Sequence, residues 1–170
     1  MIILETDRLY LEELTDSHFP DLFSLLSNPL VHRYFPKALD EAESREFLEK
    51  VKRKYREDGF SFWALIRKED RQFLGICGLL KQVVDEVEEV EVGYRILDRF
   101  WGKGYGTEAA GGCIRYARDV LRKQSVIALI REVNHESIRV AEKNGMVGEK
   151  VTTFHCLPHR VYRITFAPRS

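Results

Sequence analysis

Residues 99–109 read Arg99-Phe-Trp-Gly-Lys-Gly-Tyr-Gly-Thr-Glu-Ala109, with three glycines at alternate positions ahead of a helix-like run. Glycine permits sharp turns and lets the backbone approach a ligand closely. The first amides of a helix have no partner within it, and the helix dipole places partial positive charge there. Lys103 adds a full positive charge beside these amides. The stretch therefore predicts a binding site for a phosphate or pyrophosphate group.

Two well-known phosphate loops fit this stretch poorly. A P-loop requires Ser or Thr after its Gly-Lys pair, but Gly104 follows Gly102-Lys103. The run Gly104-Tyr-Gly106-Thr-Glu-Ala109 matches a dinucleotide-binding fingerprint, yet residues 97–101 separate it from the preceding strand pattern. A dinucleotide fold also needs several more strand–helix–strand units than this chain can hold. A dinucleotide-binding enzyme is therefore kept only as a secondary alternative.

Length and composition restrict the class of protein. The chain has 170 residues, so we expect a single domain over residues 1–170 with a sizeable core. Lys plus Arg number 27 and Asp plus Glu number 27, which leaves no basic surplus for nucleic acid. The sequence contains no signal-peptide pattern and no apolar run of about 18 residues, and its three cysteines are widely spaced. We expect a cytoplasmic protein without a nucleic-acid or membrane partner.

Hydrophobic periodicity predicts the order β-α-α-β-β-β-α-β-α-β-β. The expected strands cover residues 8–14, 61–67, 73–81, 87–96, 126–131, 147–154 and 161–166, the last two joined across residues 157–160. The expected helices start near Asp16, Asp40, Thr107 and His135, with Glu43 at capping-box distance from Asp40. Consecutive strands favour antiparallel pairing, and the later β-α-β passage favours one parallel pair. We expect an α+β protein with a mixed, mostly antiparallel sheet of about seven strands and four helices.

The glycine loop resembles the coenzyme A pyrophosphate loop of the GNAT superfamily of N-acetyltransferases, usually Arg/Gln-x-x-Gly-x-Gly/Ala at a strand-to-helix turn. Here the loop falls on Trp101-Gly-Lys-Gly104-Tyr-Gly106, with Trp in place of Arg or Gln. Trp-Gly-Lys-Gly-Tyr followed by Glu-Ala is similar to the RimJ/RimL-like branch of ribosomal-protein N-terminal acetyltransferases. The element order also resembles the GNAT fold from about Glu5 to Phe166. The resemblance implies acetyl-CoA as cosubstrate and no metal.

The resemblance also implies a set of cofactor-binding residues. These are Val92, Gly93, Trp101, Gly102, Lys103, Gly104, Tyr105, Gly106, Thr107, Asn134 and Ser137. Within the set, Glu91-Val-Gly-Tyr94 resembles the family's Glu-Ile-Gly-Tyr at a β-bulge, which implies that amides near Val92 and Gly93 face the thioester carbonyl. A glycine that merely bends the strand fits this position equally well.

Acetyl transfer to an amine requires a base, and Glu91 is our candidate. Partial burial on a strand beside the acceptor cleft raises the pKa of a carboxylate toward neutrality. Strand alternation puts Glu89 and Glu91 on one face, so both are ordinary surface charges if that face is solvent. His155 is the alternative base, because its ordinary pKa suits proton transfer near neutral pH.

A second passage bears on the leaving thiolate. Asn134-His-Glu-Ser-Ile-Arg-Val-Ala-Glu-Lys-Asn-Gly-Met146 resembles the family's Asn-x-x-Ser…Glu-Lys-x-Gly-Phe. Many members have a Tyr four residues before that glycine as general acid, where this chain has Ala141. The resemblance therefore implies Ser137 as the catalytic hydroxyl and Asn134 as a partner of the pantetheine arm. Asn134 is also a good helix N-cap, and both roles are compatible.

Together these patterns predict an acetyl-CoA-dependent N-acetyltransferase that moves the acetyl group directly to a primary amine. The resemblance favours a protein or peptide N-terminal amine as acceptor. The alternatives are a small amine, such as a polyamine, an antibiotic or an amino-acid derivative, and a non-catalytic acyl-CoA-binding sensor. A monomer and a homodimer that pairs C-terminal strands are both compatible with the sequence.

Overall fold

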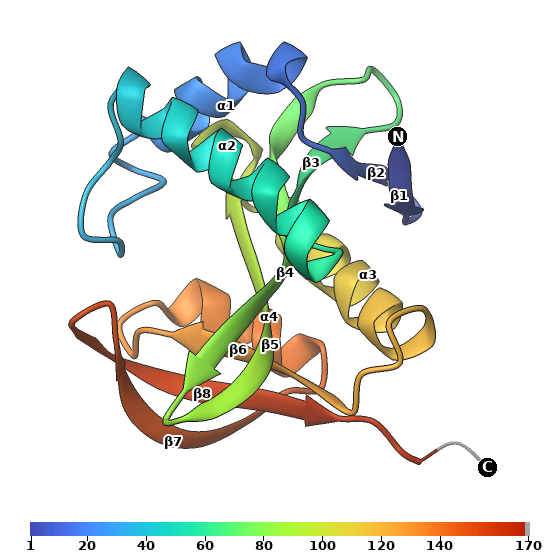
Figure 1. Cartoon of the computed structure of the whole chain (residues 1–170), viewed down its shortest axis with the longest axis vertical. Helices are drawn as coiled ribbons and strands as arrows, with labels where there is room; N and C mark the ends of the chain where they lie inside the picture. Colours follow the sequence, from blue (N-terminus) through green and yellow to red (C-terminus); the bar gives the residue numbers. More distant parts are fainter. Residues whose placement is uncertain (169–170) are drawn as a thin grey trace.

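The computed structural model describes residues 1–168. Within them, eight strands form one mixed sheet in the order β1-β2-β3-β4-β5-β6-β8-β7, accompanied by four α-helices (Figure 1). The strands are β1 (Ile2–Glu5), β2 (Leu9–Glu13), β3 (Phe62–Arg67), β4 (Phe73–Val84), β5 (Val87–Ile96), β6 (Ser125–Ile130), β7 (Val147–Phe154) and β8 (Leu157–Thr165). The helices are α1 (Phe19–Leu26), α2 (Glu41–Asp58), α3 (Tyr105–Asp119) and α4 (His135–Lys143), with 3-10 turns η1 (Asp16–His18) and η2 (Asp98–Phe100). The predicted α+β class with a mixed, mostly antiparallel sheet is confirmed.

None of these helices in residues 1–168 has the length and apolarity needed to cross a membrane. The predicted cap of α2 is present, because the Glu43 amide donates to Asp40 Oδ1 at 2.8 Å and the Glu43 side chain accepts from the Asp40 amide.

The sheet contains one strand more than the seven predicted. Strand β1, Ile2–Glu5, pairs antiparallel with β2, and the Thr6 amide donates to Leu9 O at 2.9 Å to close the turn between them. The prediction began the first strand at Arg8. A run of four residues is too short to show the alternation on which strand prediction relies.

The predicted connection across residues 157–160 is wrong, because these residues belong to β8. His155 and Cys156 form the turn between β7 and β8, with φ angles of +50° and +63°. Asp85 and Glu86 join β4 to β5 in the same way, with φ angles of +48° and +70°. Two successive positive φ angles are typical of a tight hairpin turn, but neither pair has the usual Asn-Gly sequence.

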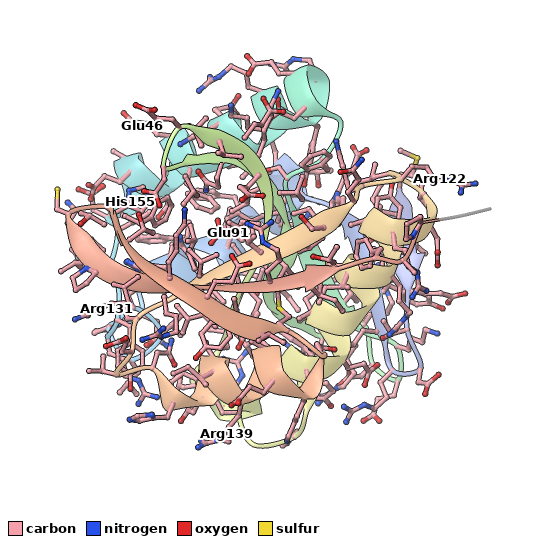
Figure 2. The ribbon with its side chains drawn as sticks, turned by 90° about the horizontal axis from the view of Figure 1, so that it is seen from below. Glu46, Glu91, Arg122, Arg131, Arg139 and His155 are labelled. Atoms are coloured by element: carbon pink, nitrogen blue, oxygen red, sulfur yellow. The ribbon has the colours of Figure 1, made fainter. Side chains whose placement is uncertain are left out.

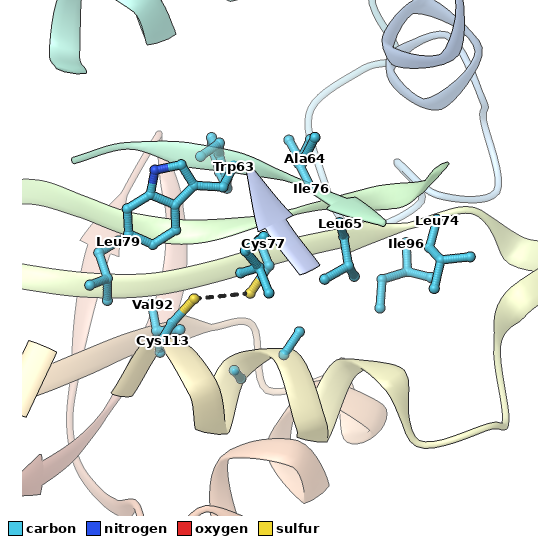
Figure 3. Close-up of a cluster of buried hydrophobic side chains, with 14 of the residues drawn as sticks. Trp63, Ala64, Leu65, Leu74, Ile76, Cys77, Leu79, Val92, Ile96 and Cys113 are labelled. Atoms are coloured by element: carbon cyan, nitrogen blue, oxygen red, sulfur yellow. Dashed lines mark hydrogen bonds between the residues drawn. The ribbon is translucent and has the colours of Figure 1, made fainter. Parts of the chain in front are cut away.

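The two faces of the sheet pack against different helices. On one face Cys77 Sγ of β4 lies 3.6 Å from Cys113 Sγ of α3, within a cluster of buried side chains that includes Trp63 (Figure 3). On the other face the Phe62 ring of β3 stacks on Phe47 of α2, with centroids 5.7 Å apart. Successive residues of β5 therefore face α3 and α2 in turn.

Strand β5 pairs very differently with its two neighbours. Its antiparallel register with β4 runs without a shift from Gly75–Ile96 to Val84–Val87, so the β-bulge expected at Val92–Gly93 is not in this ladder. Its parallel pairing with β6 has a single registered pair, Glu91 with Ile127. The two strands separate beyond that pair, and the gap between them, rather than a bulge, frees the edge of β5.

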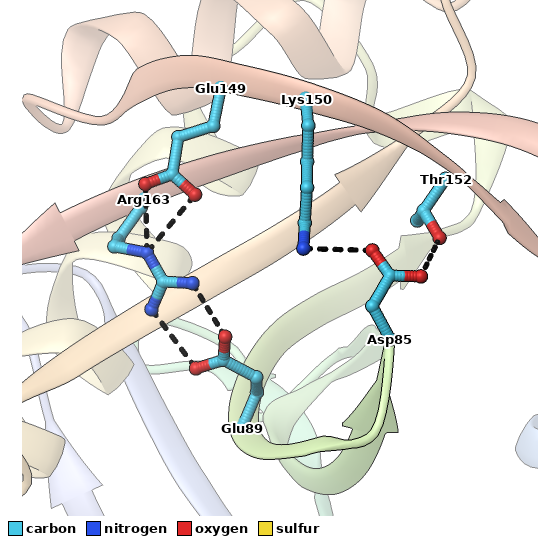
Figure 4. A network of polar contacts seen from close by, with 6 residues as sticks. All are labelled: Asp85, Glu89, Glu149, Lys150, Thr152 and Arg163. Atoms are coloured by element: carbon cyan, nitrogen blue, oxygen red, sulfur yellow. Dashed lines mark hydrogen bonds and ion pairs between the residues drawn. The ribbon is translucent and has the colours of Figure 1, made fainter.

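Polar contacts between distant segments fix the ends of the sheet. Glu108, in the first turn of α3, accepts from Thr6 Oγ1 at 2.5 Å and pairs with Arg8 Nε at 2.6 Å. At the other end Arg163 of β8 binds Glu89 of β5 and Glu149 of β7 (Figure 4). The first contact fixes the start of α3 against the N-terminal hairpin, and the second holds β5 against the C-terminal strands.

Two registered glycines give a stability test of this sheet. A Cβ at Gly78 would lie 2.1 Å from the Ser61 carbonyl oxygen, whereas a Cβ at its partner Gly93 would meet only ordinary contacts at 3.6 Å or more. We expect Gly78→Ala to lower the free energy of unfolding by about 1–3 kcal/mol or more, because a backbone strand must move. Gly93→Ala should change it by less than about 1 kcal/mol. Urea unfolding measures both, and equal losses would contradict the packing described here.

Candidate active site

A cavity of about 850 Å³ opens where β5 and β6 separate, and it extends to the start of α3, to α4 and to the segment between α1 and α2. Most of the predicted site residues line it, namely Glu91, Val92, Gly93, Trp101, Gly102, Gly104, Tyr105, Gly106, Thr107, Asn134 and Ser137. Lys103 does not line this cavity. It is exposed, and its carbonyl oxygen accepts from Arg8 Nη1 at 3.0 Å.

The glycine loop presents free amides to this cavity. Gly102 and Gly104 have φ angles of +77° and +81°, a region that side chains with a Cβ rarely adopt. Gly104 is the N-cap of α3, and the first bond inside the helix is Glu108 N to Gly104 O at 3.1 Å. The amides of residues 105–107 therefore precede that bond and are available to an anion.

Trp101 takes the place of the family's usual first loop residue and has a structural contact of its own. Its Nε1 donates to Ile96 O at 2.8 Å, which ties the loop back to the end of β5. The Arg33 guanidinium lies 5.0 Å from the Trp101 ring and pairs with Glu136 of α4 at 3.2 Å. The segment between α1 and α2 thus reaches both the glycine loop and α4.

Glu91 is a buried carboxyl group in the middle of the molecule (Figure 2). Its side chain is 9% exposed and accepts one hydrogen bond, from Gln82 Nε2 at 3.0 Å. Burial raises the pKa of Glu91 to about 7, against smaller opposing effects of the Gln82 hydrogen bond and the Arg95 charge. At neutral pH both protonation states are populated, as a group that accepts and returns protons requires.

Glu89, which shares a face with Glu91, has a different environment. It forms an ion pair with Arg163, whose Nη1 lies 2.9 Å from Glu89 Oε1. This pair lies on the same face of β5 as Glu91, but further from the glycine loop. Its charge is therefore neutralised by a structural partner, whereas the Glu91 carboxyl group has no ion pair among residues 1–168. Only Glu91 lines the cavity.

The alternative base, His155, also lines the cavity, from the turn between β7 and β8 (Figure 2). Its ring lies 4.0 Å from the Phe154 ring. Burial lowers the pKa of His155, and the charges of His159, Lys50 and Arg95 lower it further. The structure thus brings both candidate bases to one cavity.

Ser137 contacts a residue that the sequence analysis did not select. The Tyr94 hydroxyl lies 3.1 Å from Ser137 Oγ, and burial raises the pKa of Tyr94 to about 12. Asn134 Oδ1 accepts from the Ser137 amide at 3.2 Å, which confirms the predicted N-cap and leaves the Asn134 amide nitrogen for another partner. Tyr94 lay within the quoted Glu91–Tyr94 motif, but nothing in the sequence indicated a contact with α4.

Arg95 is the second residue that sequence reasoning missed. It lies on the same face of β5 as Glu91 and Gly93 and lines the cavity. The basic residues of the cavity wall are Arg33, Lys50, Lys54, Lys81, Arg95, Arg131, Arg139 and Lys143. The acidic ones are Asp58, Glu91 and Glu136. This excess of positive charge favours an anionic ligand.

The chain belongs to the GNAT acetyltransferases. The family model "Acetyltransferase (GNAT) domain" matches residues 8–147. The chain is 36% identical over 160 residues to the uncharacterized protein YkkB of Bacillus subtilis, and the alignment covers 94% of this chain and 93% of that protein. Its fold is similar to that of an acetyltransferase from Agrobacterium tumefaciens, with a TM-score of 0.84, 21% identity and coverage of 96% and 94%.

A further similar structure is RimL, a ribosomal L7/L12 α-N-protein acetyltransferase, in complex with coenzyme A. The TM-score is 0.78 at 16% identity, with 97% of this chain and 98% of that chain covered. At this identity the likeness concerns the fold. The predicted enzyme class, N-acetyltransferase, is confirmed by the family.

The pKa of Glu91 predicts how stability depends on pH. The folded protein holds the Glu91 carboxyl proton more tightly than the unfolded chain does. The resulting contribution to stability is complete below pH 4.5 and is lost as the pH rises to about 7. Glu91→Gln mimics the protonated state at every pH. We expect it to raise the free energy of unfolding above pH 7 by at most about 3 kcal/mol and to have little effect near pH 4.5. Urea unfolding at both pH values measures this, and a variant less stable at high pH would contradict it.

Proposed function

We propose that this protein transfers the acetyl group of acetyl-CoA directly to a primary amine. One observation carries the proposal. The free amides of residues 105–107 and the buried Glu91 carboxyl group line the same cavity, at the point where β5 and β6 stop pairing. A phosphate-binding helix start beside a carboxyl group with a pKa of about 7 supplies both an anchor and a base.

Acetyl-CoA fits this cavity by charge, size and backbone geometry. The amides after Gly104 suit its pyrophosphate, and the basic wall suits its other phosphate. The unpaired edge of β5 near Val92 and Gly93 suits the amide groups of its pantetheine arm, with Asn134 on the opposite side. The bound molecule supplies an activated thioester. RimL, which has a similar fold, is described in complex with coenzyme A.

We assign three steps to groups of this chain, two of them side chains and one a pair of backbone amides. Glu91 removes a proton from the acceptor ammonium, directly or through water, with His155 as the alternative. The amides near Val92 and Gly93 stabilise the charge that develops on the carbonyl oxygen. Ser137, hydrogen-bonded to Tyr94 across the gap between β5 and α4, gives its hydroxyl proton to the leaving thiolate and regains a proton from solvent, to which Glu91 releases the proton that it took up.

For the acceptor we propose an N-terminal amine of a peptide or protein, as in the RimJ/RimL-like branch. The Trp101–Gly106 loop and the fold shared with RimL support this choice. A small amine is the alternative. The proposed cytoplasmic location agrees with the free state of Cys77, Cys113 and Cys156.

Calorimetric titration tests the coenzyme site first. Wild type should bind acetyl-CoA and coenzyme A, and Gly104→Val should weaken binding about 100-fold or more, because a Cβ-branched residue opposes the positive φ that orients the free amides. Gly59→Val is the matched control, since Gly59 also has a positive φ but is the C-cap of α2 and does not line the cavity. Loss of binding in both variants would indicate a folding defect, and no binding by wild type would refute the proposal.

The pH dependence of acetyl transfer tests the base. Ionisation of Glu91 predicts that kcat/KM rises with pH to a plateau above about 7. Glu91→Gln should lower kcat about 100-fold or more and remove this inflection, with acetyl-CoA affinity unchanged. If His155→Gln removes the inflection and Glu91→Gln leaves it, the base is His155. A sensor would bind acetyl-CoA and acetylate no amine.

A further inference from the structure

The Arg95 guanidinium lines the cavity without a carboxylate partner. Its Nη1 lies 3.1 Å from His32 Nε2, and this is the one hydrogen bond that the Arg95 side chain makes within residues 1–168. Its Nε is buried and has no partner. A guanidinium carries five N–H donors, so the protein leaves most of them unused. Withdrawing a cation from water without a direct partner is unfavourable unless a bound anion pairs with it.

His32 holds this guanidinium in place but does not neutralise it. His32 Nδ1 lies 3.0 Å from Asn28 O and donates there, so Nε2 is free to accept from Arg95. Burial lowers the pKa of His32, and the Arg95 charge lowers it further, which keeps the ring neutral at pH 7. The rings of Phe35 and Phe47 lie 4.4 and 5.2 Å from Arg95 Cζ. These contacts orient the guanidinium but add no negative charge, and the Glu91 carboxylate acts on it only through space, without an ion pair.

The guanidinium lies near the proposed reaction point. Glu91, Gly93 and Arg95 occupy alternate positions on one face of β5, where successive members are about 7 Å apart. The Phe62 ring connects the last two, because its Cε1 lies 3.6 Å from a Cβ placed on Gly93 and its centroid lies 5.7 Å from Arg95 Cζ. The proposed base and the unpaired cation therefore flank Gly93 on opposite sides.

We propose that the acceptor amine carries a carboxylate a few bonds away, and that Arg95 binds this carboxylate while the amine lies beside Gly93. The inference rests on the proposed acetyl transfer and specifies its acceptor. A planar guanidinium binds a carboxylate through two parallel hydrogen bonds, which would use the idle donors of Arg95. A polyamine does not fit, because its second ammonium group would meet the Arg95 cation. An acidic first residue of a peptide and a free amino acid both offer the required chemistry.

The test compares matched acceptors that differ only in charge. One pair is a peptide with Asp or Asn at its N-terminus, and the other is β-alanine or its amide. Wild-type kcat/KM should favour the carboxylate member of at least one pair, and Arg95→Gln should lower that preference about ten-fold or more. Because the ratio of kcat/KM within each pair is compared between wild type and Arg95→Gln, differences in the intrinsic reactivity of the two amines cancel. The pair that responds identifies the source of the carboxylate.

Three further measurements keep the result interpretable. Arg95→Lys, which keeps the charge but not the planar fork, should retain part of the preference, and Arg56→Gln, an exposed change on α2, should retain all of it. Binding of the N-acetylated products in the presence of coenzyme A measures the same preference without turnover. If the products bind with a preference that depends on Arg95 but no amine is acetylated, the proposed activity is refuted and the inference about Arg95 stands. An equal preference in wild type and Arg95→Gln would overturn the inference.

Discussion

The separation of β5 from β6 opens the interior of the sheet and creates the cavity. Had the two strands paired along their whole length, the sheet would be continuous and its interior closed. They share one registered pair, Glu91 with Ile127, and the edge of β5 beyond it lacks strand partners. Unpaired polar backbone in an interior is unfavourable, so an extended ligand with amide groups of its own is the natural complement. The start of α3 opens onto the same gap, so the free amides of residues 105–107 lie at one end of it.

Features with a local physical origin could be predicted from the sequence. The glycine turn before α3 and the caps Asp40 and Asn134 depend on residues within four positions of each other, so their patterns are visible in the chain. Strand β1 was missed because it is stabilised by pairing with β2 and by the Thr6–Glu108 contact rather than by its own four residues. Of the two interpretations left open for Gly93, a bulge and a bend, the bulge is absent from the ladder with β4. Strand pairing depends on β4 and β6, which the β5 sequence does not encode.

Side-chain roles in the site show the same limit. Alternation placed Glu89 and Glu91 on one face and could not distinguish them, because the distinction comes from Arg163, more than 70 residues further on (Figure 4). The sequence gives no sign that Arg95 differs from an ordinary strand residue, because its contacts with His32 and Phe35 come from a segment about 60 residues away in the chain. Within residues 1–168 neither the buried Glu91 nor the half-buried Arg95 has an ion pair, and withdrawing both groups from water lowers the stability of the protein.

The contact between Arg8 and Glu108 spans 100 residues, and it has a consequence for how the chain folds. During synthesis the N-terminal hairpin emerges first, yet the helix that holds it in place is made only after more than half of the protein has been translated. Contacts so distant in sequence make folding slow, because a long loop must close before they form. The glycine turn before α3 is therefore completed late. A tag or truncation at the first residues would act on this turn through Arg8, which contacts both the Glu108 carboxylate and the Lys103 carbonyl oxygen.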